Sequence, residues 1–231
     1  MSEHILITGA SRGIGYETAK YLANQNCSIT AIARSDDKLN QLRAYAPEQI
    51  FVLPLDITEA NAADQIKEHL EDHQLSIDGL IHNAGLLINK PFLEQTDEDW
   101  QQQLNVNLTA PIRLTRNLIS MFNEDAHIVN IGSMGGFQGS EKFPGLSAYS
   151  TVKGALAILT ECLALELADY NIKANCLCLG AVQTEMLETA FPGIEAPLNS
   201  TEMARYVGDF TINAGTFMNG KIIPVALNNP G

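Results

Sequence analysis

Basic charge and long apolar runs are scarce in this sequence. Its 231 residues hold 14 Lys and Arg against 27 Asp and Glu, a formal charge of −13. This excess of acid argues against nucleic acid or an anionic membrane as a partner, because both bind basic surfaces. No apolar run approaches the ~18 residues of a membrane span, and no secretory signal precedes the first apolar segment. We therefore expect a cytoplasmic protein with neither kind of partner.

Patterns that would indicate a metal or a disulfide framework are missing as well. The four cysteines lie within apolar segments and form no CxxC pair, which indicates buried, reduced thiols. The five histidines are scattered along the chain. They form no ligand set, so we expect no metal.

Short runs rich in Val, Ile and Leu alternate with longer amphipathic segments along most of the chain. Strands are expected at 4–8, 28–33, 49–54, 77–83, 127–132, 172–178 and 221–225. Helices are expected at 13–25, 36–45, 59–73, 97–122 and 148–169. Apolar strands separated by helices indicate a doubly wound α/β fold of Rossmann type, with a mostly parallel seven-stranded sheet and helices on both faces. We expect one domain over 1–231, with the irregular stretch 185–201 as a lid.

Two local signals refine the fourth helix. Thr96 is followed three residues later by Asp99, a pattern that resembles a capping box and would start the helix there. Pro111 lies inside the same segment. It predicts a kink, because proline removes a backbone donor and clashes with the preceding turn.

A glycine-rich turn joins the first strand to the first helix in LITGASRGIGYETAKYLA, residues 6–23. Gly9, Gly13 and Gly15 let the backbone turn tightly and approach a pyrophosphate, which would lie on the positive N-terminus of the helix. Glycines also connect elements without binding anything. Their position between the first strand and the first helix favours a dinucleotide cofactor.

The end of the second strand bears on the choice between NAD and NADP. A carboxylate there would bind the ribose 2′-hydroxyl of NAD, but this strand ends in Arg34, and Arg12 lies within the glycine turn. Two guanidinium groups suit a 2′-phosphate. NADP is therefore favoured over NAD, the alternative being that Arg34 pairs with Asp36 or Asp37 on the surface.

Tyr149 and Lys153 are four residues apart at the start of a predicted helix, so they share one helix face. Hydride transfer to a carbonyl requires a proton for the developing alkoxide, and a phenol of pKa about 10 is a poor partner near neutral pH. An adjacent ammonium favours the phenolate and would lower the pKa of Tyr149. The alternative is a core tyrosine beside a solvated lysine.

Seven strings, in order along the chain, resemble the short-chain dehydrogenase/reductase family. They are TGASRGIG (8–15), LDIT (55–58), HNAG (82–85), NVNL (105–108), IVNIGS (128–133), YSTVK (149–153) and GAVQT (180–184). The resemblance implies a nicotinamide cofactor. It also implies homodimers or homotetramers, formed through the long helices at 97–122 and 148–169.

The same resemblance implies a role for each matching residue. The implied catalytic residues are Asn107, Ser133, Tyr149 and Lys153. Tyr149 would be the general acid/base, Ser133 would bind the substrate oxygen, and Lys153 would also hold the nicotinamide ribose. Asn107 would hold a water that relays protons. Considered alone, Asn107 could be an ordinary polar group of a helix, and Ser133 could be an ordinary turn residue. The implied cofactor contacts are Gly9, Ser11, Arg12, Gly13, Ile14, Gly15, Arg34, Asp56, Ile57, Asn83, Ala84, Gly85, Tyr149, Lys153, Gly180, Val182 and Thr184.

Five departures from the family pattern affect the expected site. His82 replaces the first Asn of NNAG, and Gly132 stands where a second serine is common. An insertion at 135–145 lies beside the substrate site. Leu179 replaces a customary proline, which would loosen the loop that follows. The final residues read IIPVALNNPG instead of a VDGG-type ending.

These observations predict an oxidoreductase that transfers a hydride between NADP(H) and a carbonyl or secondary alcohol, with Tyr149 as general acid/base. The substrate is expected to be a small molecule of open class. Apolar lid residues, Phe191 and Ile194 among them, indicate a compact apolar one. The alternative is a sensor or scaffold that binds NADP(H) on the same fold without turnover.

Overall fold

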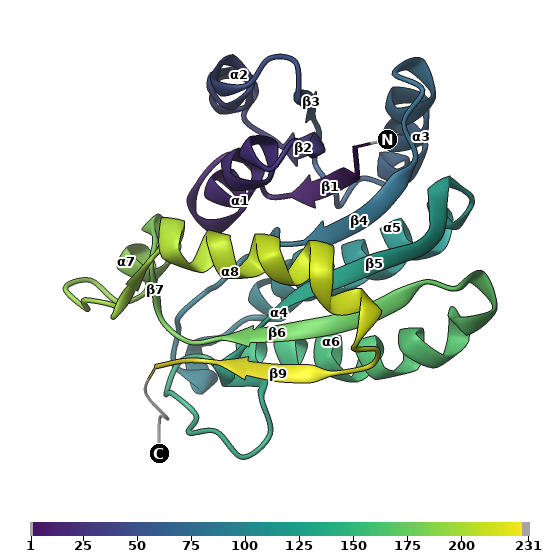
Figure 1. Cartoon of the computed structure of the whole chain (residues 1–231). Helices are drawn as coiled ribbons and strands as arrows, with labels where there is room; N and C mark the ends of the chain where they lie inside the picture. The colour runs from purple at the N-terminus through teal and green to yellow at the C-terminus, as the bar shows by residue number, and fades with distance from the viewer. Residues whose placement is uncertain (1, 228–231) are drawn as a thin grey trace.

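The computed structural model describes residues 2–227. A seven-stranded sheet with the strand order β3-β2-β1-β4-β5-β6-β9 forms its centre (Figure 1). The strands are β1 (His4–Thr8), β2 (Ser28–Ala33), β3 (Ile50–Pro54), β4 (Ile77–His82), β5 (Phe122–Ser133), β6 (Lys173–Leu179) and β9 (Ile222–Val225). Every neighbouring pair is parallel, and β1 pairs with β2 in continuous register from His4↔Ser28 to Thr8↔Ile32. The predicted doubly wound parallel fold is confirmed.

Helices cover both faces of the sheet. One face carries α1 (Gly13–Asn24), α2 (Asp36–Tyr45) and α8 (Ser200–Asn213), and the other carries α3 (Ala62–Asp72), α4 (Asp97–Leu104), α5 (Ala110–Asn117) and α6 (Ser147–Glu166). Alternate strand residues enter the two cores: Ile5 and Ile7 pack with α1 and α8, while Leu6 packs with α3 and α5. Because both faces are covered, the strands read as continuous apolar runs.

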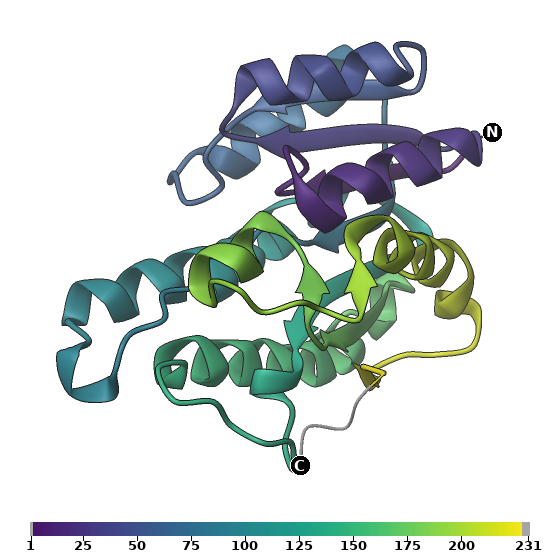
Figure 2. The same ribbon diagram turned by 90° about the vertical axis from the view of Figure 1, so that its left-hand side faces the viewer.

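The carboxyl ends of the strands meet at one edge of the sheet, which Figure 2 views face on. The strand order reverses between β1 and β4, and open α/β sheets bind ligands in the crevice outside such a reversal. A small pair of strands, β7 (Val182–Gln183) and β8 (Leu198–Asn199), and the helix α7 (Glu185–Ala190) lie across this edge.

The helix expected at 97–122 is interrupted. The capping box is confirmed: Thr96 Oγ1 accepts from Asp99 N at 3.2 Å, and Asp99 Oδ2 accepts from Thr96 N at 2.8 Å. A π-helical turn, Asn105–Thr109, separates α4 from α5, and Pro111 lies in the first turn of α5. The irregularity therefore precedes the proline, and a widened turn accommodates its missing donor.

Two helices near the C-terminus were not predicted. The segment 185–201 contains α7 and the first residues of α8, which begins with a capping box between Asn199 and Glu202. Gly208 lies inside α8, where a Cβ atom would come within 2.6 Å of the Tyr21 ring. Glycine is a poor helix former, but here its missing side chain lets α8 pack closely on α1.

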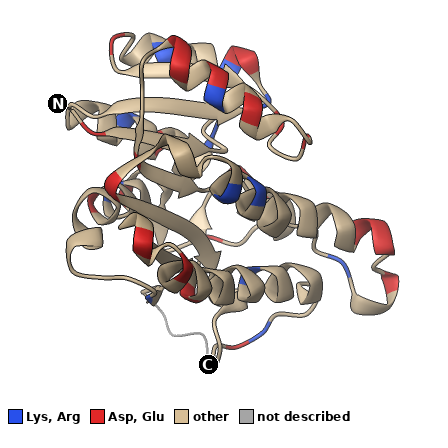
Figure 3. Cartoon of the chain, turned by 90° about the vertical axis from the view of Figure 1, so that its right-hand side faces the viewer, with Lys and Arg blue, Asp and Glu red and all other residues tan. Residues whose placement is uncertain are grey.

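Charged residues are distributed over the outer helices in both signs (Figure 3). The first turn of α4 carries Asp97, Glu98 and Asp99, and the last turn of α5 carries Arg116. This placement of acids at a helix start and a base at a helix end complements the helix dipole.

One described helix, α6, has 20 residues and contains an 18-residue window with a mean hydropathy of 1.2, so by length and composition alone it could span a membrane. It packs against β5 and β6 through Val152, Leu156 and other buried residues. Its place in the core accounts for its apolar character.

Candidate active site

A cavity of about 780 Å³ opens at the carboxyl edge of the sheet. Its volume falls in the range of about 300–1,000 Å³ that is typical of ligand and cofactor sites. We call one part the charged end, lined by Arg12, Arg34, Asp56 and Glu185. The other part is the apolar end, where Leu86, Leu87, Leu146, Met186 and Leu187 surround Ser133, Tyr149 and Lys153.

The glycine turn forms a cradle that side chains would fill. Gly9 and Gly13 have φ angles of +71° and +58°, a left-handed region that favours glycine. A Cβ atom on Gly15 would come within 2.7 Å of the Gly9 carbonyl oxygen and would collide with the Asn83 amide. The turn leads directly into the N-terminus of α1, so these residues fit the pyrophosphate of a dinucleotide.

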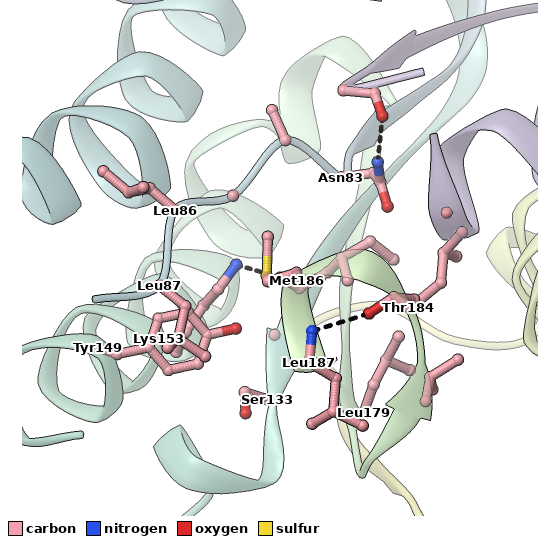
Figure 4. A pocket seen from close by; sticks show the side chains of 18 of the residues that line it. Asn83, Leu86, Leu87, Ser133, Tyr149, Lys153, Leu179, Thr184, Met186 and Leu187 are labelled. Atoms are coloured by element: carbon pink, nitrogen blue, oxygen red, sulfur yellow. Dashed lines mark hydrogen bonds between the residues drawn. The ribbon is translucent and has the colours of Figure 1, made fainter. Parts of the chain in front are cut away.

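Asn83 supports this cradle. Its Nδ2 donates to the carbonyl oxygens of Thr8 at 3.0 Å and Gly9 at 3.1 Å, and Figure 4 marks one hydrogen bond of this amide. The backbone N–H groups of Asn83 and Ala84 both donate to Thr8 Oγ1. The Asn83 amide is therefore directed at the glycine turn, and its hydrogen bonds hold the backbone that forms the expected cofactor site.

At the charged end, Arg34 follows β2 and is exposed. Among the described residues it forms no ion pair with Asp36 or Asp37, so the surface pairing considered from sequence is not present. Asp56 follows β3 and accepts from Thr58 N at 2.9 Å and Thr58 Oγ1 at 2.7 Å. Burial opposes ionisation of Asp56, but these hydrogen bonds and the charge of Arg34 lower its pKa below the usual value.

Arg12 extends from the glycine turn towards the lid. Its Nη1 lies 2.6 Å from Oε1 of Glu185, the first residue of α7. The other oxygen of Glu185 lies 3.9 Å from Lys38 Nζ. One lid carboxylate therefore lies between cations from two separate elements.

At the apolar end, Tyr149 and Lys153 lie on the first turns of α6, with 9% and 3% of their surface exposed. Lys153 Nζ donates to the Ile131 carbonyl oxygen at 2.7 Å and lies 5.8 Å from the centre of the Tyr149 ring. Ser133, at the end of β5, accepts from Gly135 N at 3.1 Å. The predicted helix face therefore brings the tyrosine and the lysine together beside Ser133 (Figure 4).

The pKa values of this pair differ from the sequence-based expectation. Burial raises the pKa of Tyr149 to about 12, although the neighbouring Ser133 hydroxyl opposes the rise. Burial lowers the pKa of Lys153 to about 8, and the nearby Cys176 and Cys178 oppose that shift. The expected lowering of the tyrosine pKa by the ammonium is thus wrong for this structure, because loss of hydration outweighs the effect of an ammonium turned towards Ile131.

Asn107 lies within the π-helical turn and is fully buried. Its Nδ2 donates to the carbonyl oxygens of Leu86 and Gln103, both at 2.8 Å, and its Oδ1 accepts from Leu86 N at 3.2 Å. Both side-chain N–H groups are therefore used, and only a remaining lone pair of Oδ1 could accept from a water. The side chain fixes the segment beside Tyr149, and its relay role stays a prediction.

The segment 185–201, predicted to be a lid, contributes Met186, Leu187 and Phe191 to the cavity lining. Thr184 Oγ1 caps α7 by accepting from Leu187 N at 3.2 Å (Figure 4). Asn89 Nδ2 donates to the Ala190 carbonyl oxygen at 2.8 Å and ties the end of α7 to the loop after β4. In Figure 4, Met186 and Leu187 face Leu87 and Tyr149 across the opening.

Most residues predicted from sequence line the cavity. They are Gly9, Ser11, Arg12, Gly13, Ile14, Arg34, Asp56, Ile57, Asn83, Ala84, Gly85, Ser133, Tyr149, Lys153, Gly180, Val182 and Thr184. Gly15 and Asn107 lie beneath it and support its wall. Sequence reasoning missed Leu86, Leu87 and Leu146, although the two leucines directly after HNAG were a usable signal.

The departures from the family pattern have local explanations. His82 is buried, its Nε2 lies 2.9 Å from Thr115 Oγ1, and burial together with the charge of Lys153 lowers its pKa to about 3. Leu179 ends β6 in register with Val225. Gly180 N donates to the Val225 carbonyl oxygen at 2.9 Å and fixes the start of the following loop; the expected loosening of that loop stays a prediction.

The insertion and the C-terminal segment border the apolar end. Phe143, in the insertion at 135–145, lines the cavity. The Gly145 carbonyl oxygen accepts from Lys90 N at 3.0 Å, which anchors the insertion to the loop after β4. The unusual ending is described only to Leu227, and 228–231 lie outside the described residues. Within 2–227, no group of three or more His, Cys, Asp or Glu side chains could hold a metal ion.

A doubly wound sheet with a glycine cradle and a buried tyrosine–lysine pair defines a class of nucleotide-dependent oxidoreductases. Comparison with known proteins identifies the family: residues 3–195 match the family model described as short chain dehydrogenase, and the chain belongs to this family. The protein is an NAD(P)-dependent oxidoreductase of that family.

Individual relatives differ in their names and in the cofactors they hold. The 2,3-dihydro-2,3-dihydroxybenzoate dehydrogenase of Bacillus subtilis is 31% identical over 183 residues, covering 78% of this chain and 70% of its own. The 3-oxoacyl-(acyl-carrier-protein) reductase FabG of Vibrio harveyi is 27% identical, covering 88% and 83%. A short chain dehydrogenase from Burkholderia cenocepacia in complex with NADP has a TM-score of 0.89 at 23% identity, covering 99% and 98%. A 3-ketoacyl-(acyl-carrier-protein) reductase from Brucella melitensis complexed with NADH has a TM-score of 0.87 at 23% identity, covering 96% of each chain.

Proposed function

We propose that this protein is an NADP(H)-dependent carbonyl reductase, or the reverse alcohol dehydrogenase, with Tyr149 as general acid/base. The observation that carries the proposal is the juxtaposition of Tyr149, Lys153 and Ser133 at one end of a cavity whose other end is a glycine cradle. The bound cofactor supplies the hydride. The protein supplies a proton, a positive charge and a dry, shaped site.

The proton comes from the Tyr149 hydroxyl. In the reduction of a carbonyl, the oxygen gains negative charge as the hydride arrives, and Tyr149 donates its proton to that oxygen. Ser133 Oγ donates a hydrogen bond to the same oxygen and stabilises the developing charge. Lys153, held beside the phenol ring by its bond to Ile131, favours the phenolate that remains after proton transfer.

The charged end supports NADP as the preferred cofactor. Arg34 is exposed at the end of β2 and Arg12 lies in the glycine turn, so both guanidinium groups border the expected position of the adenosine ribose. A 2′-phosphate is a strong acceptor for guanidinium donors. NAD remains the less favoured alternative.

The outer faces of α4 and α6 support a homodimer or homotetramer. Ile158 and Leu165 on α6 are 61% and 80% exposed, and a shallow groove between the two helices includes Trp100 and Val152. Apolar side chains on such a face stabilise association when a second copy covers them. We expect a cytoplasmic, single-domain subunit whose lid is the segment 185–201, and light scattering after size-exclusion chromatography measures the assembly.

The test is a carbonyl panel assayed in parallel with NADPH and NADH, following oxidation of the cofactor. We expect turnover, faster with NADPH at low cofactor concentration, that is lost in Tyr149→Phe. Tight NADPH binding without turnover on any carbonyl would favour the second candidate, a non-catalytic sensor. The observation that favours this second candidate is the raised pKa of Tyr149, because a phenol with a raised pKa is a weaker proton donor.

A further inference from the structure

We propose that the substrate is an uncharged, apolar ketone or aldehyde, and that the apolar end excludes carboxylated and phosphorylated carbonyls. This inference rests on the proposed function and specifies its substrate class. The charged residues that line the cavity, among those the structure describes, are Arg12, Arg34, Asp56, Lys153 and Glu185. All but Lys153 belong to the charged end, so they are placed for the cofactor.

The wall of the apolar end is formed mainly by aliphatic side chains, while Gln102 and Asn105 are uncharged polar residues of the cavity lining. Leu86 and Leu87 follow β4, Leu146 precedes α6, and Met186 and Leu187 extend from the lid. In Figure 4, Leu87, Met186 and Leu187 lie around the space beside Tyr149. An apolar body gains free energy by contact with such a surface, at about 25 cal/mol per Å² buried.

Lys90 and Lys142, in the loops next to the apolar end, form polar contacts outside the cavity. Lys90 Nζ lies 2.8 Å from Asp99 Oδ2, an ion pair in which the pKa of Asp99 falls to about 2, mainly through the hydrogen bond from Lys90. Lys142 Nζ donates to the Phe137 carbonyl oxygen at 2.6 Å and to Ser140 Oγ at 2.7 Å. Neither lysine lines the cavity, so a substrate anion would be buried without a counter-charge.

Lys153 does not serve as that counter-charge. Its ammonium group donates to the Ile131 carbonyl oxygen at 2.7 Å and lies 5.8 Å from the centre of the Tyr149 ring, where it acts on the tyrosine. An unpaired carboxylate buried in an apolar site is strongly disfavoured. The site therefore selects by excluding charge, while apolar contact supplies the binding free energy.

The test uses benzylacetone and its para-carboxylate, which share the reacting ketone and differ by one charge. Each ketone is titrated into protein saturated with NADP⁺, where both partners are oxidised and no turnover occurs. We expect the dissociation constant of the carboxylate to be at least about 100-fold higher. Equal affinity, or tighter binding of the carboxylate, would overturn the substrate class.

A gain-of-function variant sharpens this test. Leu187→Arg places a cation on the lid and should reduce the affinity difference between the two ketones at least about tenfold, whereas Leu187→Gln, the matched uncharged control, should not. An unchanged difference in Leu187→Arg would count against the proposal. Parallel NADPH turnover tests the proposed function separately, because ketone binding without turnover refutes catalysis and leaves the substrate class standing.

A second inference concerns cofactor choice and rests on the Glu185 ion pairs. The geometry points to Glu185 as a residue that competes with the 2′-phosphate of NADP for Arg12 and Lys38. Its two oxygens lie 2.6 Å from Arg12 Nη1 and 3.9 Å from Lys38 Nζ, so one carboxylate already neutralises two cations near the expected 2′-phosphate. Because Glu185 begins α7, the same contacts hold the lid against the glycine turn.

The test compares Glu185→Gln with Glu188→Gln, an exposed acid on the same helix that forms none of the ion pairs between described residues. Dissociation constants for NADPH and NADH are measured by fluorescence. In Glu185→Gln we expect NADPH to bind roughly 3–10-fold more tightly and NADH to be unchanged. Weaker NADPH binding, or an equal change for both cofactors, would show that Glu185 only fastens the lid.

Discussion

The charged end and the apolar end of the cavity differ in both exposure and chemistry. Arg12 and Glu185 are 52% and 58% exposed at their side chains and meet in a surface ion pair. Lys153, at the apolar end, is 3% exposed and donates to a backbone carbonyl. Exposed ion pairs contribute about 0–1 kcal/mol and are screened by salt, whereas a buried charge strongly perturbs its neighbours.

This difference indicates that the two ends of the cavity have separate functions, cofactor selection at the charged end and proton transfer at the apolar end. Solvated charges at the charged end can select between cofactors that differ by a phosphate, and they need no rigid framework. The aliphatic side chains at the apolar end disfavour bound water, so we expect proton transfer there to depend on a few fixed groups. The predictions below test whether the two ends act separately.

The largest effect is expected for Lys153→Met, which keeps the bulk of the side chain and removes its charge. We expect kcat for carbonyl reduction to fall at least about 100-fold, because Tyr149 loses the cation that favours its phenolate. Steady-state kinetics with NADPH measures this. Lys173→Met, at the opposite edge of the sheet, is the control, and an active Lys153→Met enzyme would remove the lysine from the mechanism.

Arg34→Ala should act on the charged end alone. Hydrogen bonds to charged groups contribute about 1.5–3 kcal/mol, so NADPH should bind roughly 10–100-fold more weakly while NADH is unchanged. Fluorescence titration of both cofactors measures the change, with Arg43→Ala on the last turn of α2 as the control. Parallel losses for both cofactors would contradict selection by the 2′-phosphate.

The pH dependence should separate the two ends without any mutation. Lys153 has a pKa lowered to about 8, so it loses its proton as the pH rises through that value, and kcat/KM for reduction should fall about tenfold per unit above it. Tyr149 stays protonated over this interval, since its pKa is about 12. NADPH binding should change little, because the guanidinium groups keep their charge; a flat rate profile up to pH 10 would contradict this assignment.

Asn83→Ala tests the support that this side chain gives to the glycine cradle. It removes the hydrogen bonds to Thr8 and Gly9, and we expect a loss of about 1–3 kcal/mol in the free energy of unfolding. NADPH and NADH should both bind about tenfold more weakly, since the pyrophosphate site is common to them. Denaturant unfolding and cofactor titration measure the two effects, with Asn40→Ala on α2 as the control; a selective effect on NADPH would argue against this role.

The sequence alone predicted those elements and site residues that depend on a local pattern of residues. The strands β1 and β2 and the helix α2 have the predicted bounds, because continuous apolar runs and clear helix starts define them. The glycine turn and the Tyr149–Lys153 spacing were also readable, since a turn and one helix face are local features.

Features that depend on tertiary contact could not be read in this way. α8 was missed because Gly208 weakens its helical pattern, and only the approach of Tyr21 explains that glycine. Asn83 supports the glycine turn through hydrogen bonds to Thr8 and Gly9, which precede it in the sequence by 75 and 74 positions. The rise in the pKa of Tyr149 follows from burial, which spacing along a helix does not reveal.

The most direct test is a crystal structure with NADP⁺ and an apolar secondary alcohol bound. We expect the alcohol oxygen within about 3 Å of both Tyr149 Oη and Ser133 Oγ, its apolar body against Leu87 and Leu187, and Lys153 beside the nicotinamide ribose. A Tyr149 hydroxyl turned away from the nicotinamide ring, with the Lys153 amine in bulk solvent, would contradict the account.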